Sequence, residues 1–571
     1  PGLYLDRVFA AMDSVIVNGQ AICRSDIDPA AAYEIDYFTA LNGFADGGFA
    51  SDRYYSFTPG DGSCAPLNPF GRYAASREAQ EFVTASLEDE LTVEQTVISA
   101  ITTGEFEVLD FLLDGPIGYA LGAEYRDESS DNKLDPITLG ILPATTSFTP
   151  GVQVSSVDPF LFSYTSIDND QQFNTSGSYD VYDTFAEVRL PIFRDRPFAK
   201  ELTLDGAFRR ADYSTLGEAN TWKVGGTWAP FADLNFRATK SEAVRAPNIS
   251  ELFDPQLPIT ISATADPCDP GNVGLGTSVR QANCIADLQA AGVPLSQIVG
   301  GGGNYIWVNP LTGRFSGVSG GNPALDVETA ETITLGLVYA PSFIEGLSLT
   351  VDYWDVTIED AIQAVGANDI LEGCLDSGSY NNVPFCGSYT RRADGGLNFL
   401  ETGQINFAAL EASGVDFAVG YTFDVAKNSF GARLVGSYQE KLDQFFNPAD
   451  PTEINPAIEE IQLPELSGTL NLSWARGPLR VGLQTNYQSR QSVDAIEDVL
   501  GLYGRQALYG DDGFFDETYI FDANASYEFS DSLSVYGGVN NIADEEPFSN
   551  QTAWPVGPRG RFFFFGVTYR Q

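Results

Sequence analysis

Leu479-Arg-Val-Gly-Leu-Gln-Thr-Asn-Tyr-Gln488 alternates apolar and polar side chains over its whole length. Because successive side chains of a strand point to opposite faces, one face of this stretch suits hydrocarbon and the other suits water. Residues 117–126 and 519–529 alternate in the same way. Strands of a soluble β-sandwich also alternate, so the pattern predicts an all-β protein and leaves a sandwich and a membrane barrel open.

The lengths of the connections favour the barrel. About sixteen strands are predicted by this pattern, at 2–17, 92–108, 115–130, 178–193, 201–214, 219–231, 234–247, 328–341, 347–363, 405–423, 428–445, 463–476, 478–493, 517–530, 532–544 and 559–571. Their connections are alternately short and long, except at 215–218. In an up-and-down barrel alternate connections lie on opposite rims, so all the long loops lie on one side. Long extracellular loops and short periplasmic turns are typical of outer-membrane barrels, and a sandwich has no reason to segregate its loops.

Composition fits this fold class and excludes others. The chain has 571 residues, 12% aromatic residues and 56 glycines. No stretch approaches the roughly 18 consecutive apolar residues of a spanning helix. The net charge of −47 leaves no basic stripe for a phosphate backbone, so we expect no nucleic-acid partner. No linker or charge run divides the chain, and no signal peptide follows Pro1.

The six cysteines lie in pairs within three long connections. Cys23 and Cys64 share the first, Cys268 and Cys284 another, and Cys374 and Cys386 a third. Three disulfides, each local to its loop, are the simple hypothesis, and they imply an oxidising compartment. Metal binding is the alternative, but the chain has no histidine and no close CxxC pair.

The residue types give no enzyme site. Without histidine, Ser-His-Asp and Cys-His nucleophile systems are excluded, as are ordinary zinc hydrolase sites. The acidic clusters at 127–135 and 168–170 lack the EF-hand spacing, so we expect solvated loops there rather than calcium sites. We therefore predict no catalytic residues, no cofactor and no metal ligands.

Four stretches resemble segments of the TonB-dependent outer-membrane receptors. Residues 240–253 (KSEAVRAPNISELF) are similar to the family's S-x-A-x-R-A-P-x-x-x-E-L-F segment, and 321–331 (GNPALDVETAE) to its G-N-P-x-L-x-x-E segment. Residues 539–547 (VNNIADEEP) match N-x-x-D-x-x-P, and 560–571 (GRFFFFGVTYRQ) resemble the closing strand. Each stretch alone is weak evidence, but the order and spacing of the four stretches are specific for this family.

The resemblance covers nearly the whole chain and implies a barrel of about 22 strands around an N-terminal plug. Since about sixteen strands are predicted here, residues 1–571 are expected to be the C-terminal portion of the barrel, with the plug and its TonB-contacting box absent from this chain. Members of the family commonly end on an aromatic residue, whereas this chain ends in Gln571.

The resemblance also implies a function. An outer-membrane receptor of a Gram-negative bacterium would import a scarce nutrient, such as siderophore-bound iron, cobalamin or an oligosaccharide, using energy delivered by the TonB complex. Its partners would be that complex, acting through the absent plug, outer-membrane lipid and a small-molecule ligand. Two alternatives remain open, namely a passive 16-stranded porin and a secreted β-rich adhesin.

Few individual residues can be assigned roles. Tyr305 and Trp307 lie in the longest loop and could stack on a planar ligand, although packing against the neighbouring disulfide is the simpler explanation. Arg245 is expected to face the lumen and contact the plug, and Pro247 to form the bend between strand and loop. Asn540 and Asp544 are the motif residues that follow the penultimate strand.

Overall fold

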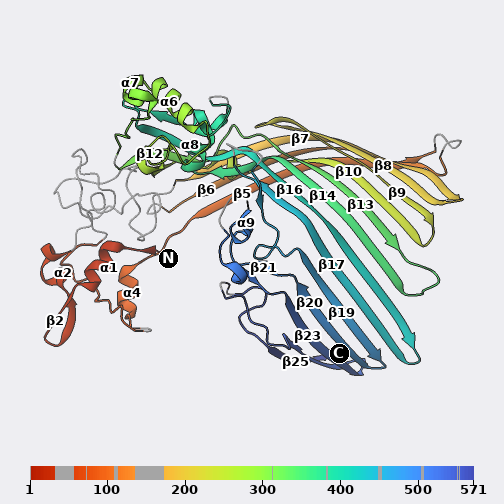
Figure 1. Ribbon diagram of the computed structural model, residues 1–571. Helices are drawn as coiled ribbons and strands as arrows, with labels where there is room; N and C mark the ends of the chain where they lie inside the picture. Colours follow the sequence, from red (N-terminus) through yellow and green to blue (C-terminus); the bar gives the residue numbers. More distant parts are fainter. Residues whose placement is uncertain are drawn as a thin grey trace.

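The structure is a computed structural model that describes residues 2–32, 57–71, 74–107, 113–135, 173–311, 313–380, 383–447, 453–502, 507–549, 551 and 553–570. Long antiparallel strands form a curved wall, and folded connections gather at one end of it (Figure 1). We call this the cap end and the opposite end, where short turns join the strands, the turn end. No helix among the described residues has the length and apolarity needed to cross a membrane.

One barrel sheet contains the wall, and each long strand is antiparallel to the next long strand along the chain. Its long strands are β5 (Glu90–Phe106), β6 (Ile117–Lys133), β7 (Thr175–Arg196), β8 (Ala199–Tyr213), β9 (Gly217–Phe231), β10 (Leu234–Arg245), β13 (Glu328–Tyr339), β14 (Leu347–Val365), β16 (Leu397–Val425), β17 (Asn428–Phe445), β19 (Leu466–Arg476), β20 (Leu479–Gln488), β23 (Thr518–Ser530), β24 (Leu533–Asn540) and β25 (Phe562–Tyr569). Every strand predicted from residue 92 onward overlaps one of these. The predicted class, an antiparallel transmembrane β-barrel, is confirmed, while the strand number of a complete barrel stays a prediction.

The registers align the apolar faces of neighbouring strands. Val481 and Leu483 of β20 lie opposite Ala525 and Ala523 of β23. Because directly opposite residues share a face of the sheet, the alternation within one strand continues across the wall. One face of the wall is therefore apolar, and we call it the outer face. The other face carries polar and charged side chains.

Several strands are longer than a membrane requires. A spanning β-strand needs about 9–11 residues, whereas β7 has 22 residues and β16 has 29. The first residues of β16 pair with two short strands of the folded connections, β12 (Arg314–Gly320) and β15 (Tyr389–Arg391). The extra length of β16 therefore lies at the cap end.

Aromatic side chains gather on the outer face near the turn end. Phe423 stacks on Phe430 with ring centroids 5.1 Å apart, and Phe198 meets Phe231 at 5.7 Å. Phe198 is 71% exposed. Exposed rings at this level are typical of the aromatic girdle that marks the membrane boundary of a barrel.

The predicted first strand, at 2–17, is wrong. This segment contains α1 (Leu5–Met12) and the hairpin of β2 (Ser14–Val17) and β3 (Gln20–Cys23). The apolar residues of α1 recur at a helical spacing, and Asn18 and Gly19 adopt the positive φ angles, 52° and 83°, of a type I′ hairpin turn. The remaining elements of this N-terminal unit are β1 (Gly2–Leu3), α2 (Arg24–Ile27), η1 (Pro29–Ala31), α4 (Arg77–Val83) and β4 (Thr84–Ala85).

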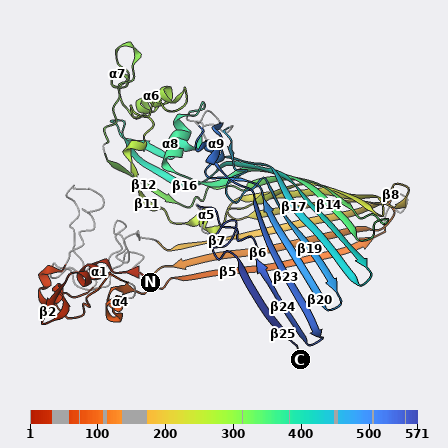
Figure 2. The ribbon, with the colours of Figure 1, turned by 60° about the horizontal axis from the view of Figure 1, so that its bottom comes forward.

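Two long connections fold together into a cap. The first, between β10 and β13, contributes α5 (Ile249–Phe253), β11 (Leu257–Ser262), η2 (Ala263–Ala265), α6 (Arg280–Ala290), α7 (Leu295–Ile298), η3 (Gly301–Gly303) and β12. The second, between β14 and β16, contributes α8 (Ala367–Leu375), η4 (Pro384–Gly387) and β15. Both views show these elements gathered at one end of the wall (Figure 2). Shorter elements in later connections are β18 (Asn455–Pro456), β21 (Gln491–Ser492), α9 (Ile496–Leu500), η6 (Gly510–Asp512) and β22 (Phe514–Phe515).

Candidate functional site

Arg245, the last residue of β10, joins the wall to the base of the cap. Its Nη1 and Nη2 donate to the carboxylate of Glu251 at 3.0 and 3.2 Å, and its Nε and Nη2 donate to Glu328. Glu328 also accepts from the backbone N–H of Ile362 at 2.7 Å. Glu251 completes a capping box with Asn248 at the start of α5. One guanidinium therefore links β10 and β13 to α5, with β14 held through Glu328.

The two motif stretches on either side of the first cap connection touch each other. The backbone N–H of Gly321 donates to the backbone carbonyl of Asp254 at 3.0 Å. The backbone N–H of Asn322 donates to the backbone carbonyl of Glu251 at 2.7 Å. Leu252, which is 1% exposed, packs with Leu325. These contacts close the connection where it leaves and rejoins the wall, so a structural role accounts for both motifs.

Replacing Gly321 with alanine should destabilise the base of the cap. A Cβ at this position would lie 2.6 Å from the backbone nitrogen of Asp254 and 2.9 Å from the carbonyl carbon of Leu252. Backbone atoms cannot move aside cheaply, so we expect a loss of about 1–3 kcal/mol. Proteolysis of the cap at increasing urea concentrations measures the effect. Gly313→Ala is the control, because its Cβ meets nothing within 4 Å; equal losses in both variants would contradict the prediction.

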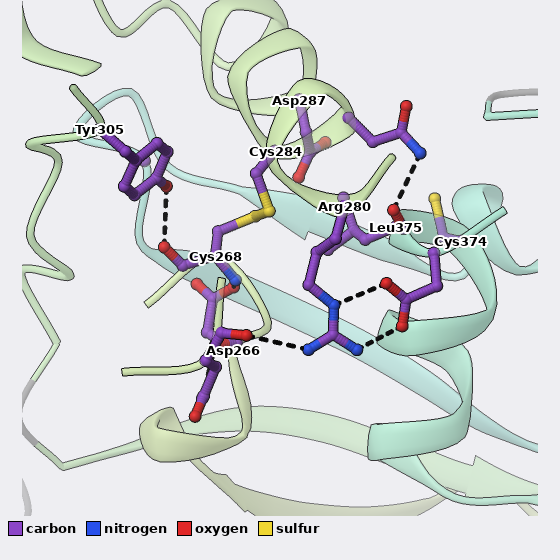
Figure 3. The surroundings of a disulfide bond; sticks show 12 residues. Asp266, Cys268, Arg280, Cys284, Asp287, Tyr305, Cys374 and Leu375 are labelled. Carbon is purple, nitrogen blue, oxygen red and sulfur yellow. Dashed lines mark hydrogen bonds and ion pairs between the residues drawn. A yellow bond between two sulfur atoms is a disulfide. The ribbon is translucent and has the colours of Figure 1, made fainter. Parts of the chain in front are cut away.

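Buried ion pairs join the two connections of the cap, and Figure 3 shows the surroundings of Arg280, which makes one of them. Arg391 of the second connection donates from Nη1 and Nη2 to Asp266 of the first at 2.7 and 2.9 Å, and from Nε to Asp287. In the opposite direction, Arg280 of the first connection donates from Nε to Asp376 of the second connection at 2.6 Å. The side chains of Arg391 and Asp266 are 2% and 0% exposed. Bidentate geometry offsets part of the cost of burying these charges.

Disulfides stabilise each connection separately. Cys268 is bonded to Cys284 within the first connection and Cys374 to Cys386 within the second. Cys23 is bonded to Cys64 in the N-terminal unit. These are the pairs that the loop positions suggested, and no described cysteine is free. Both cap disulfides lie in apolar clusters that also contain Leu288, Ile298, Trp307, Ile370, Leu371 and Phe385.

Three tyrosines bury their hydroxyl groups around the ion pairs. Tyr305 donates to the carbonyl of Cys268 at 2.8 Å, and Tyr380 donates to Asp287 at 3.1 Å. Burial, reinforced by nearby carboxylates, raises the pKa of Tyr305, Tyr380 and Tyr389. The phenolate form is therefore strongly disfavoured in the folded cap.

The cap should therefore open at alkaline pH. Each tyrosine has a folded pKa above its unfolded value of about 10, so its contribution to stability is complete below that pH and is lost as the pH rises through the folded pKa. Absorbance at 295 nm during a pH titration, combined with proteolysis of the cap, measures this. Tyr380→Phe should delay the opening. A cap that resists proteolysis equally below and well above the unfolded tyrosine pKa would contradict the prediction.

A groove of about 880 Å³, lined by both polar and apolar residues, lies between the base of the cap and the cap ends of several wall strands. Asp254 lines it, and burial raises the pKa of this carboxyl. No lysine or arginine is among the described residues that line the groove. Its other polar side chains are Asn132, Thr175, Asn248, Ser250, Glu251, Ser319 and Gln404. The groove can thus hydrogen-bond a polar ligand but offers no cation to an anionic one.

Tyr305 and Trp307 lie inside the cap. Trp307 is 4% exposed, and its Nε1 donates to the carbonyl of Asp394 at 3.4 Å. Tyr305 packs against the cluster that contains the Cys268–Cys284 disulfide. The burial of Trp307 and the partial burial of Tyr305 favour the packing interpretation over contact with a ligand.

At the end of β24 the structural role falls to Asn541, which lies three residues before Asp544 as the motif N-x-x-D-x-x-P requires, and not to Asn540, the residue expected from the sequence. Asn541, rather than Asn540, is buried, and its side chain exchanges two 2.8 Å hydrogen bonds with the backbone of Glu545. Asp544 accepts from the backbone N–H of Arg561 at 2.7 Å, so it ties this turn to the start of β25. The positive φ of Asn541, 53°, is the signal that favours asparagine there.

The structure also gives the locations of Pro247 and of the acidic cluster at 127–135. Pro247 is buried directly after β10 ends, as expected for a bend between strand and loop. The acidic cluster at 127–135 lies along and just beyond the cap end of β6, and the cluster at 168–170 lies outside the described residues. In the part of the chain that the structure describes, no group of His, Cys, Asp or Glu side chains could hold a metal ion.

An antiparallel wall with one apolar face, an aromatic girdle and loops folded at one end defines a membrane β-barrel. The chain belongs to the TonB-dependent receptor family, because the family model "TonB dependent receptor-like, beta-barrel" matches residues 25–542. Proteins of this family are receptors and transporters of the outer membrane of Gram-negative bacteria, not enzymes.

Several solved structures are similar to this chain and longer than it. The siderophore receptor PirA from Acinetobacter baumannii is 12% identical, with a TM-score of 0.49 over 84% of this chain and 55% of its own. The ferric enterobactin receptor of Pseudomonas aeruginosa in complex with enterobactin is 16% identical (TM-score 0.48; 84% and 54%). The ferric-catecholate import receptor Fiu from E. coli is 13% identical (TM-score 0.43; 84% and 55%). The chain therefore spans about half the length of these proteins. No curated protein matches the sequence.

Proposed function

We propose that this chain forms the wall and external loops of an outer-membrane receptor that imports a scarce nutrient with energy from the TonB complex. Membership of the TonB-dependent receptor family carries this proposal. The one-sided arrangement of the cap supports it, because a receptor must present folded loops to only one side of the membrane.

The ligand is proposed to enter the groove at the base of the cap. In the described cap, Arg280, Arg391 and Arg392 are each engaged with carboxylates of the cap itself, and Arg314 of β12 is the remaining cationic side chain. With Asp254 at the groove and a chain net charge of −47, a polyanion such as a ferric tris-catecholate meets an unfavourable field. Cobalamin, an oligosaccharide, or a neutral or cationic iron chelate is favoured instead.

Nutrient uptake by the intact receptor in cells tests both the proposed coupling to TonB and the proposed entry of the ligand through the groove. We expect uptake to require TonB and to be competed by neutral ligands more strongly than by polyanionic chelates. Gln404→Trp should obstruct the groove and abolish uptake, whereas Gln484→Trp, on the polar face of β20 away from the groove, should preserve it. Uptake that persists without TonB, together with steady single-channel conductance, would favour the passive porin. A protein that stays soluble without detergent would favour the adhesin.

A further inference from the structure

One strand of the cap has an edge that no other strand covers. β11 pairs with β12 along its whole length, and β12 pairs on its other side with β16. The wall strand that precedes β11, β10, is already flanked by β9 and β13. Within the described part of the chain, no strand pairs with the second edge of Leu257–Ser262 and no hydrogen bond from another segment reaches it. We call this the open edge of β11.

Pro258 indicates which backbone groups face the open edge. Successive residues of a strand direct their N–H and C=O groups to opposite sides, and a proline in a strand is accommodated where its missing N–H would point away from the neighbouring strand. Pro258 lies opposite Val318 without a shift of register. Thr260 and Ser262, which alternate with the residues bonded to β12, therefore present their backbone groups to the open edge. The donor missing at Pro258 discourages pairing with a long strand, so the edge suits a short segment.

The same strand lines the groove at the base of the cap. Leu257 and Ile259 belong to the groove lining, and Leu134 and Phe173 line it from the ends of β6 and β7. Directly opposite residues of neighbouring strands share a face of the sheet. A segment added to the open edge would therefore direct every second side chain to the face of Leu257 and Ile259, into the groove.

Opposite charges mark the two ends of the open edge. Asp254 lies three residues before β11 and lines the groove. At the other end, Arg314 lies opposite Ser262 and is exposed, and no carboxylate among the described residues pairs with it. The six residues of β11 span about 20 Å at the usual rise per residue. An extended peptide of this length that runs parallel to β11 would bring its ammonium towards Asp254 and its carboxylate towards Arg314.

We propose that the open edge of β11 binds a short extended peptide with free termini by strand addition, with alternate side chains in the groove. Main-chain hydrogen bonds give such a site its affinity, and the pockets for alternate side chains give it selectivity. Oligosaccharides lack the regular amide donors and acceptors that a strand edge pairs with. A zwitterionic peptide also avoids the unfavourable field that a polyanion meets. The inference rests on the proposed function, because it names the ligand class of the groove proposed for uptake.

Equilibrium dialysis of the intact receptor in detergent against synthetic hexapeptides tests the inference, with mass spectrometry to quantify the bound peptide. Three pools of random sequence and free termini are compared, namely an unmodified pool, one N-methylated at positions 2 and 4, and one N-methylated at positions 3 and 5. Only one edge of the peptide pairs with β11, so one methylated pool should bind about tenfold more weakly, corresponding to about 1.4 kcal/mol. The other should bind within about twofold of the unmodified pool. Equal affinity of all three pools, or no retention of the unmodified pool at millimolar concentration, would overturn the proposal.

Two substitutions at one position separate the backbone from the side chain. Thr260→Pro removes an N–H of the open edge without removing a bond to β12, so it should weaken peptide binding about tenfold. Thr260→Val keeps this N–H and should bind the unmodified pool normally. Equal binding by the two variants would contradict the proposal. The heat-dependent shift on gel electrophoresis reports the folded fraction, and the methylated pools decide the question if the proline variant does not fold.

The charge at the groove gives an independent readout. Asp254→Asn should weaken binding of peptides with a free ammonium several-fold and leave binding of acetylated peptides unchanged, whereas equal effects on both would overturn the proposed direction of the peptide. Because dialysis needs neither TonB nor transport, peptide binding can be observed even where TonB-dependent uptake fails. TonB-dependent uptake of another nutrient, without any peptide binding, would overturn this inference and leave the proposed function intact.

Discussion

Replacing Arg391 with methionine should unfold the cap while the wall stays folded. The guanidinium of Arg391 donates to Asp266 and Asp287, and it also donates to the carbonyl of Gly395 at 2.8 Å. Its removal leaves two carboxylates without their cation in a region where Asp266 is fully buried. Breaking a buried pair from one side costs about 3–5 kcal/mol. Hydrogen exchange of the cap elements, followed by mass spectrometry, measures the local loss.

The neighbouring arginine provides a matched control. Arg392 pairs with Asp394 at 2.9 Å, but the two side chains are 40% and 50% exposed. Water compensates both groups when such a pair is removed, so Arg392→Met should cost at most about 1 kcal/mol. Similar exchange rates in the Arg391 and Arg392 variants would show that burial does not govern the stability of the cap.

Replacing Cys268 and Cys284 together with alanine should open the first connection of the cap. The bond joins residues 16 apart in sequence, and closing a loop of this length in the unfolded chain is worth about 3 kcal/mol. Alanine avoids placing a hydroxyl group in the apolar cluster around the sulfur atoms. We expect rapid proteolysis within the first cap connection, read from the fragment masses, without loss of the wall.

Two comparisons make this prediction specific. Cys23→Ala with Cys64→Ala removes a bond from the N-terminal unit, so it should expose that unit to protease and leave the cap resistant. The Nη2 of Arg391 lies 3.3 Å from the Sγ of Cys268, so the disulfide and Arg391 variants should not be additive. Additive losses would show that the bond and the ion pairs act independently.

The wall could be predicted from the sequence because its signal is local. Alternation within a strand such as β20 reports which side chains face lipid, and short connections such as 477 report a turn between antiparallel neighbours. Only the first predicted strand failed. There, Leu5–Met12 has the spacing of a helix, and Asn18-Gly19 has the signature of a two-residue hairpin turn. Both signals were present in the sequence, but the alternation outweighed them.

The candidate site was much less predictable. The roles of Arg391 and Arg280 depend on carboxylates about a hundred residues away, in the other connection of the cap. The periodicity of apolar and polar residues along the chain does not predict an ion pair between two distant loops. Packing was the simpler explanation for Trp307 in the sequence, and the structure places this ring among Leu288, Ile298 and the disulfide. Asn541, by contrast, could have been chosen over Asn540 from the sequence, because it lies three residues before Asp544 as the motif N-x-x-D-x-x-P requires.

The sequence by itself determined the antiparallel barrel class, its apolar face, the segregation of loops and the receptor family. The first three follow from contacts between residues close in the chain or on adjacent strands, where alternation and turn residues act directly. The family follows from the resemblance of four motifs. Only the tertiary structure decided that two distant loops form one cap, that Arg245 joins this cap to the wall, and where the groove and the open edge of β11 lie. These features depend on burial and on charges brought together across long separations, so no local pattern in the chain specifies them.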